Sequence, residues 1–179
     1  PDAPPREERR TQAVMARRYA EADDATDLGR LDPEAIAEVR AQAWPDARNA
    51  DEMHEALMGL GAVTLAEADL HGWLPMLQSL AKSKRATRVD AGAGLWWAAE
   101  RLPQAKALHP EATWSPKIGV PDSYARDWAR EEACIALVRA RLTGLGPVTA
   151  ATMAESLALP RSDIDLALLA LENEGFVMR

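Results

Sequence analysis

Apolar residues recur at spacings of three and four along much of the chain, which is the period of helices that bury one face. The clearest stripe lies in the run from Tyr124 to Leu142 and contains Cys134, Leu137, Val138 and Leu142. A second stripe, beyond Pro160, contains Ile164, Leu168 and Leu171. These spacings predict two amphipathic helices, the first ended by the glycine turn at 144–146 and the second by Gly175.

A six-residue segment occurs twice, which indicates an internal duplication. Residues 59–64 read GLGAVT and residues 144–149 read GLGPVT, so five of the six positions are identical. The same offset aligns Leu57 with Leu142, and Leu74-Pro75 with Leu159-Pro160. Because the flanking matches keep the register, we interpret the two regions as copies of one structural unit.

Each copy is predicted to contain a helix, a short helix, a longer helix and then a strand. In the first copy, Asn49 or Asp51 caps a helix and Thr64 caps the short helix. The third helix extends from Trp73 to Lys82. Residues predicted to face the core are Met53, Leu57, Leu60, Leu74, Leu77 and Leu80.

The second copy follows the same plan. Thr149 caps its short helix, which turns Met153 and Leu157 inward, and Pro160 lies in the first turn of the third helix. Residues 176–178 (FVM) then begin a strand.

Two extended runs in the first copy predict a β-hairpin. Residues 85–89 (RATRV) and 95–98 (LWWA) flank the glycine-rich tip at 90–94 (DAGAG). Three helices followed by a hairpin form a winged helix-turn-helix, in which the third helix can enter a DNA major groove. We therefore predict a mostly α fold of tandem winged helix-turn-helix domains with short β-hairpin wings.

The remaining segments set the predicted domain boundaries. Residues 6–19, 32–44 and 100–108 have helical character, and residues 110–121 form a connector rich in proline. The expected layout is an N-terminal helical arm at 1–31, a first winged-helix domain at 32–110 and a linker at 111–123. A second winged-helix domain at 124–179 has a truncated wing.

Composition supports a helical protein and limits its partners. Apolar residues make up 47% of the 179 residues, and alanine and leucine far outnumber valine and isoleucine. The net charge of −7 argues against a surface that is positive throughout, so only local basic patches are expected. One cysteine and three scattered histidines predict neither a disulfide framework nor a Cys/His zinc site. Without a long apolar run or leader sequence, we expect no membrane association and a cytoplasmic location.

The two ends of the sequence suggest a fragment. The chain begins at Pro1 and stops at Arg179, directly after a strand that has no predicted partner. We therefore expect a larger parent protein, with room for a catalytic centre outside these residues.

Three segments resemble the bacterial large helicase-related (Lhr) proteins, in the region that follows the helicase core: residues 5–14 (PREERRTQAV), 28–36 (LGRLDPEAI) and 171–179 (LENEGFVMR). The resemblance spans nearly the whole chain. It implies a parent ATP-dependent DNA helicase that acts in DNA repair, uses ATP and Mg, and translocates on single strands with an upstream motor. This chain has no phosphate-loop motif, so the motor is not within it. Some relatives are associated with glycosylase activity, but no residue here matches such a catalytic role.

The strongest local charge feature is a basic cluster at the end of the predicted third helix, formed by Lys82, Lys84, Arg85 and Arg88. Cations grouped in this way displace the counterions that condense on DNA phosphates. Gln78 lies on the adjoining, nearly neutral helix face. The alternative is a solvated helix end whose cations complement the helix dipole.

Two other features are candidate contacts. Trp96 and Trp97 are adjacent on one predicted strand, so alternation points one inward and one outward. Packing of the outward ring against a neighbouring helix is the favoured interpretation, and stacking of Trp97 on a base is the alternative. A second basic patch consists of Arg6, Arg9, Arg10, Arg17 and Arg18. We favour a structural role for it, docked on the helicase core. No catalytic or metal role is assigned to any residue.

The third helix of the second copy has a different character. Its outward face carries Asp163, Asp165, Leu166, Leu169 and Glu172, which would repel phosphates and expose leucines. We expect this face to pack against another domain.

Three functions remain open from the sequence. The first is a segment that binds DNA, most simply single-stranded DNA, between an upstream helicase core and a downstream C-terminal module. The second is a scaffold or oligomerisation module of the same protein. The third is a free-standing winged-helix transcription regulator.

Overall fold

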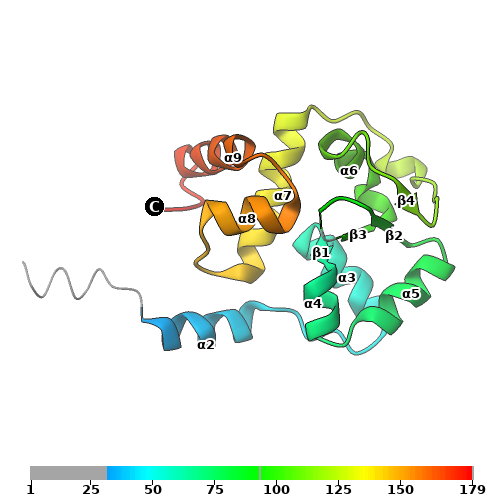
Figure 1. Cartoon of the computed structure of the whole chain (residues 1–179), viewed down its shortest axis with the longest axis horizontal. Coiled ribbons are helices and arrows are strands. Elements are labelled where there is room, and N and C mark those ends of the chain that lie inside the picture. The colour runs from blue at the N-terminus through cyan, green and yellow to red at the C-terminus, as the bar shows by residue number, and fades with distance from the viewer. Residues whose placement is uncertain (1–31, 93, 179) are drawn as a thin grey trace, which may run out of the picture. The chain divides into compact units, whose positions relative to one another are not determined.

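The computed structural model describes residues 32–92 and 94–178, which are mostly helical with one small antiparallel sheet (Figure 1). The chain divides into two units, residues 1–39 and 40–179. The predicted helix at 6–19 lies outside the described residues. The helices are α2 (Pro33–Ala43), α3 (Ala50–Leu60), α4 (Leu65–Leu70), α5 (Leu74–Lys82), α6 (Leu102–Leu108), α7 (Arg130–Leu145), α8 (Ala150–Leu157) and α9 (Arg161–Asn173). The strands are β1 (Val63–Thr64), β2 (Ala86–Val89), β3 (Leu95–Ala98) and β4 (Trp114–Ser115), and short 3₁₀ turns cover 99–101 and 122–124.

The strands form an antiparallel sheet in the order β1-β3-β2-β4. The predicted hairpin is confirmed as β2 and β3, with Arg88 opposite Trp96 and Val89 opposite Leu95. β4 was not predicted. It comes from the proline-rich connector and pairs with the outer edge of β2, where Arg88 lies opposite Ser115.

Helix starts follow the capping residues that the sequence offers. The Asn49 side chain accepts hydrogen bonds from the first turn of α3. Thr64 forms a capping box with Glu67 at the start of α4, and Thr149 caps α8. Each cap satisfies backbone amides that the helix itself leaves unpaired. The predictions for these caps are confirmed.

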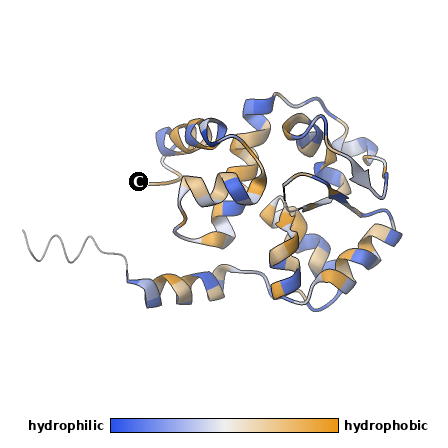
Figure 2. Ribbon diagram, in the orientation of Figure 1, coloured by the Kyte–Doolittle hydropathy of each residue, from blue (hydrophilic) through white to orange (hydrophobic). Residues whose placement is uncertain are grey.

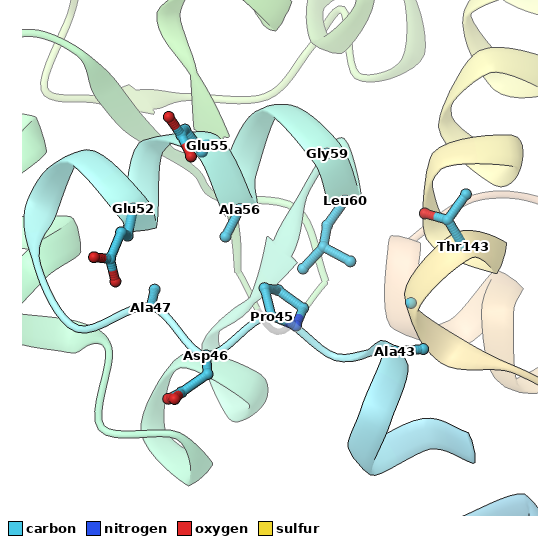
Figure 3. Close-up of a pocket in the computed structure, with 11 residues that line it drawn as sticks. Ala43, Pro45, Asp46, Ala47, Glu52, Glu55, Ala56, Gly59, Leu60 and Thr143 are labelled. Atoms are coloured by element: carbon cyan, nitrogen blue, oxygen red, sulfur yellow. The ribbon is translucent and has the colours of Figure 1, made fainter.

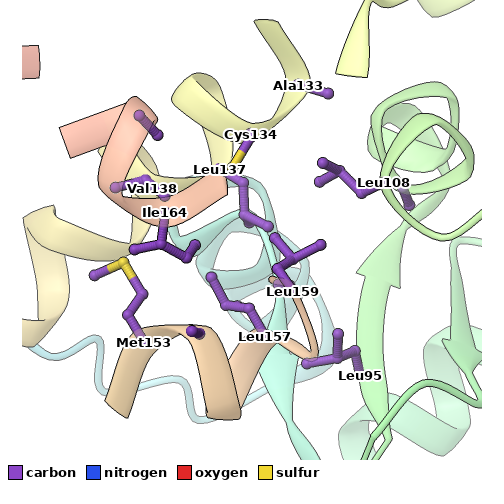
Figure 4. Packing of buried hydrophobic residues seen from close by; sticks show 14 of the residues in the cluster. Leu95, Leu108, Ala133, Cys134, Leu137, Val138, Met153, Leu157, Leu159 and Ile164 are labelled. Carbon is purple, nitrogen blue, oxygen red and sulfur yellow. The ribbon is translucent and has the colours of Figure 1, made fainter. Parts of the chain in front are cut away.

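Two apolar clusters lie on opposite faces of the sheet, and several helices contribute apolar residues to each. Figure 2 shows that hydrophobic and hydrophilic residues alternate along these helices. The N-terminal core lies among α3, α4, α5 and one face of β3, and includes Met53, Leu57, Leu77, Leu80 and Trp96. The shared core lies between the other face of the sheet, α6, and the C-terminal bundle formed by α7, α8 and α9. Leu95 and Leu108 contribute to it together with Cys134, Leu137, Met153, Leu157 and Ile164 (Figure 4).

The glycine turn predicted at 144–146 begins later than expected, because α7 continues through Gly144 to Leu145. A Cβ built at Gly144 would lie 2.6 Å from the Leu60 side chain and 3.4 Å from the Trp44 ring. Gly144 therefore serves close packing between helices, and only Gly146, with φ of 61°, ends the helix.

Three other boundaries differ from the predictions. α7 begins at Arg130 rather than near Tyr124, which lies in a 3₁₀ turn. Pro160 is the N-cap of α9 rather than a residue of its first turn. Residues 176–178 form no strand, because no partner strand lies beside them in the described part of the chain.

Candidate nucleic-acid interface

The exposed side of α5 carries no acidic residue. Leu77 and Leu80 are buried in the N-terminal core, which leaves Gln78, Ser79 and Lys82 exposed on the opposite face. No Asp or Glu occurs between Asp69 and Asp90, so the sequence from α5 through most of β2 holds only neutral and basic residues. No carboxylate of this segment would therefore repel a polyanion that approaches the exposed face of α5.

Lys84 lies in the turn that ends α5 and has a left-handed backbone conformation, with φ of 61°. The amide of Lys84 donates to the carbonyl of Ala81 and the amide of Arg85 donates to the carbonyl of Leu80, at 3.1 and 2.8 Å. These two bonds form a Schellman motif, whose left-handed position is usually glycine. The left-handed conformation is unfavourable for lysine. The Lys84 side chain is exposed, so its ammonium group reaches solvent.

Arg85 is the one member of the basic cluster that has an acidic partner. Its guanidinium lies 2.5 Å from the carboxylate of Asp51, in the first turn of α3. The Asp51 carboxylate therefore balances much of the charge of Arg85. We expect Arg85 to contribute less to DNA binding than Lys82, Lys84 and Arg88.

Arg88 on β2 is exposed, and its guanidinium is not hydrogen-bonded within residues 32–92 and 94–178. The other nine arginines in this part of the chain all donate hydrogen bonds to carboxylates, carbonyl oxygens or an amide oxygen. Arg88 has neither a hydrogen bond nor an ion pair within this part of the chain, and Lys82 and Lys84 have no ion pair there either. Three cations without an internal partner thus lie within seven residues.

Trp97 does not fit the predicted stacking role, because its side chain is fully buried. Alternation along β3 does point Trp96 and Trp97 to opposite faces, but each face of the sheet packs against a core. Trp96 lies in the N-terminal core and Trp97 in the shared core. The prediction was wrong because it assumed that one face of the hairpin meets solvent.

The tip of the β2–β3 hairpin packs against the C-terminal bundle. A Cβ built at Gly92 would lie 2.8 Å from the Cβ of Ala158, the residue that ends α8. Both residues have positive φ, 55° and 52°. Close packing of the two backbones holds the hairpin in place, so Arg88 projects from an anchored strand.

Three buried or half-buried arginines connect the elements and were not singled out from the sequence. Arg141 on α7 is 1% exposed, donates to the carbonyl oxygen of Ala62 at 2.8 Å and pairs with Glu67. Arg101 donates to the carbonyl oxygen of Met58 near the end of α3. Arg130 bridges Asp163 and the carbonyl oxygen of Leu108. Each bond joins residues more than twenty positions apart in the sequence, so these roles become evident only in the folded chain.

Two of the larger pockets in the described residues do not favour phosphate binding. One, of about 440 Å³, is lined by carboxylates of Asp46, Glu52 and Glu55 together with apolar side chains (Figure 3). A wider groove of about 600 Å³ contains Arg126 and Arg139, but each lies over an aromatic ring and pairs with a glutamate. These cations already have partners inside the molecule.

Burial shifts the pKa of one thiol and one imidazole in the described residues. Burial raises the pKa of the Cys134 thiol to about 11, with a further contribution from Asp163. Burial, assisted by the charge of Arg130, lowers the pKa of His109. His54 forms a 3.0 Å contact with Glu100. Within the residues that the structure describes, no cluster of His, Cys, Asp or Glu is arranged to hold a metal ion.

The outward side of α9 is apolar and acidic, as the sequence predicted. Leu166 is 63% and Leu169 46% exposed. Asp163 pairs with Arg130 and Asp165 with Arg161. The two third helices thus differ: α5 presents neutral and basic groups, whereas α9 presents leucines flanked by charge.

The arginine-rich patch at residues 6–18 lies outside the described residues. None of the described helices is long and apolar enough to cross a membrane.

A comparison with protein-family models found no match, and no curated protein matches the chain.

Proposed function

We propose that this chain is the tandem winged-helix, DNA-binding segment of an Lhr-type ATP-dependent DNA helicase that acts in DNA repair in the cytoplasm. The observation that carries the DNA-binding part is a group of three cations, Lys82, Lys84 and Arg88, that have no ion-pair partner among the described residues and lie beside the acid-free face of α5. The helicase part rests on the three sequence segments that resemble that family.

The arrangement of α3, α4 and α5 with strands in the order β1-β3-β2 supports a winged-helix plan for the first half. In that plan α5 is the helix that meets nucleic acid. The three helices α7, α8 and α9 repeat the order of the first three helices, without a hairpin in the residues described.

Binding through this surface would act mainly on the phosphate backbone. The ammonium groups of Lys82 and Lys84 and the guanidinium of Arg88 would replace condensed counterions, so affinity would fall steeply with salt. Gln78 and Ser79 could add hydrogen bonds to phosphate or base edges. With Trp97 buried, no aromatic side chain of the proposed contact set is available to stack on bases. The motor, with ATP and Mg, would be supplied by the upstream core.

The test measures DNA binding by the whole chain through fluorescence anisotropy, with single-stranded and duplex oligonucleotides over a range of salt concentrations. The variant carries Lys82→Gln, Lys84→Gln and Arg88→Gln. Losing three phosphate contacts should lower the salt slope of the affinity by about 2 for single strands and about 3 for duplex. The preferred substrate is the oligonucleotide that the parent chain binds more tightly at the same salt concentration.

A matched control changes Lys106 and Lys117, two exposed lysines outside the cluster, to Gln and is compared with the Lys82→Gln/Lys84→Gln pair. Both pairs alter net charge equally, so a general charge effect would weaken binding equally. Equal loss in the two pairs, or unchanged affinity of the triple variant, would remove this surface from DNA binding.

The exposed leucines of α9 favour a second role, that of a scaffold or oligomerisation module within the same protein. This role is compatible with DNA binding, because α5 and α9 belong to different parts of the fold.

A further inference from the structure

We infer that a pocket lined by Trp44 and by parts of α4, α7 and α8 binds a small ligand that combines one carboxylate with an apolar body. This pocket, here called the α7–α8 pocket, has a volume of about 340 Å³. Pockets that hold small molecules begin at about this size. The pocket shares no residue with the basic surface on α5 and β2, so the inference does not depend on the proposed DNA binding.

Two side chains of this pocket have a buried N–H group without a hydrogen-bond acceptor among the described residues. They are Trp44, through its indole Nε1, and Arg141, through its guanidinium Nε. The Arg141 side chain is 1% exposed, and its terminal nitrogens donate to the Ala62 carbonyl oxygen and to the Glu67 carboxylate. The Arg141 guanidinium carbon lies 5.6 Å from the centre of the Trp44 ring. Because buried donors are unfavourable without an acceptor, a ligand that supplies oxygen atoms to both neighbouring groups would be stabilised.

The charges that line the α7–α8 pocket favour an anion. Arg40 and Arg141 contribute two guanidinium groups, whereas Glu67 is the one carboxylate in the described lining. Glu67 pairs with Arg141. Within the described residues Arg40 donates to carbonyl oxygens, those of Leu145 at 2.7 Å and of Pro147. One positive charge therefore remains without a carboxylate in a chain whose net charge is −7, and a single ligand carboxylate would match it.

The remaining walls of the pocket suit an apolar body. Leu145 and Val148 contribute aliphatic groups, and Trp44 contributes its ring. Stacking holds this ring in place, because its centre lies 5.5 Å from the His71 ring and 5.9 Å from the Trp73 ring. A wall that is already ordered loses little freedom when a ligand binds. An anion without an apolar body would match the charge but leave these walls in contact with water.

The first test records ¹H–¹⁵N correlation spectra of the whole chain during a titration with phenylacetate. The chain has six tryptophans, so the Trp44 indole N–H is assigned as the resonance that Trp44→Phe removes. Phenylacetate should shift this resonance to saturation, because its carboxylate supplies the missing acceptor. The Nε–H resonance of Arg141 should shift with the same dissociation constant. Two donors that are satisfied only by internal water would leave both resonances unchanged, which would overturn the inference.

The second test compares ligands by isothermal titration calorimetry. Phenylacetamide keeps the ring and a carbonyl oxygen but lacks the charge, whereas acetate keeps the charge and lacks the ring. Each should bind at least about tenfold more weakly than phenylacetate, because the first loses charge-assisted hydrogen bonds and the second loses apolar contact. Equal affinity for phenylacetate and phenylacetamide would overturn the anionic class of ligand, and equal affinity for phenylacetate and acetate would overturn the apolar body.

Two pairs of variants locate the binding in this pocket. Arg40→Gln should weaken phenylacetate binding several-fold and leave phenylacetamide binding unchanged, because it removes a positive charge. Arg48→Gln, at an exposed position outside the pocket, alters the net charge equally and should change neither affinity. Val148→Phe should weaken phenylacetate binding about tenfold, because the added ring occupies the pocket. Val120→Phe, at a half-buried position outside the pocket, is the steric control, and thermal unfolding checks that each variant is folded.

A Trp44 indole resonance that does not move at about 10 mM phenylacetate would overturn the inference, since that concentration would saturate even a weak site. A shift that Arg40→Gln and Val148→Phe both leave undiminished would also overturn it, because the ligand would then bind elsewhere.

Discussion

The guanidinium of Arg141 on α7 forms an ion pair with the carboxylate of Glu67, the residue that also completes the capping box of α4. The Arg141 side chain is 1% exposed, and the Glu67 carboxylate accepts a hydrogen bond from the Thr64 amide at 2.8 Å. A helix start in the N-terminal half is thereby fixed to a helix of the C-terminal bundle.

Replacing Arg141 with Met should lower the free energy of unfolding by about 2 to 4 kcal/mol, because Glu67 and the Ala62 carbonyl each lose a buried partner. Urea unfolding followed by circular dichroism measures the change. Adding Glu67→Gln should recover part of the loss, since the uncompensated charge is removed. Arg139→Met, which breaks the half-exposed pair with Glu174, should cost less than about 1 kcal/mol. Equal losses in the two arginine variants would contradict a special role for Arg141.

Lys84→Gly should change stability and DNA binding in opposite directions. Glycine adopts the positive φ of this Schellman position without strain, so the free energy of unfolding should rise by up to about 1 kcal/mol. Loss of the ammonium group should lower the salt slope of DNA affinity by about 0.7 to 0.9. Thermal unfolding and anisotropy titrations on one preparation separate the two effects. A stabilised variant with unchanged DNA affinity would show that Lys84 does not contact phosphate.

Gly92→Ala should destabilise the chain by about 1 to 3 kcal/mol, because a methyl group would lie 2.8 Å from the Cβ of Ala158 at a position with positive φ. Ala158→Gly removes the opposing methyl group and also relieves a left-handed alanine. The double variant should therefore be more stable than the sum of the two single changes predicts, which a double-mutant cycle of urea unfolding measures. Strict additivity would mean that the hairpin tip and α8 are not in contact in solution.

The buried His109 should make the free energy of unfolding fall in mild acid. Burial and the charge of Arg130 lower its pKa in the folded chain, whereas the unfolded chain keeps a value near 6.5. As pH falls through about 6.5, the unfolded state binds a proton that the folded state does not, so the free energy of unfolding falls. Unfolding measured at several pH values should show a smaller decline in His109→Gln than in the parent chain. His71→Gln, at an exposed position, controls for the loss of a histidine, and an equal decline in all three proteins would exclude His109 as the cause.

Local features of the fold could be predicted from the sequence because neighbouring residues determine them. The caps at Thr64 and Thr149 and the buried stripe of Cys134, Leu137 and Val138 depend on spacings of a few residues. The basic cluster could be located in the same way, although its free and paired members could not be distinguished. Arg85 finds Asp51 only through the fold, 34 residues away along the chain.

The missed packing features depend on contacts that the neighbouring residues in the sequence do not reveal. Gly144 was interpreted as a turn because the close approach of Leu60 and Trp44 is not encoded nearby. Trp97 was expected to stack on a base because the local sequence does not show that its face of the sheet is covered by the shared core. Arg141 was not noticed because a buried arginine is plausible only once its partner is known.

The covering of the sheet on both faces has a thermodynamic consequence. Val89, Leu95 and Trp97 are buried in the shared core, to which α6 contributes Leu108 and the C-terminal bundle contributes Leu137 and Leu157. Separation of the bundle from α6 and the sheet would expose part of this core to water. The sheet, α6 and the bundle should therefore melt as one cooperative unit.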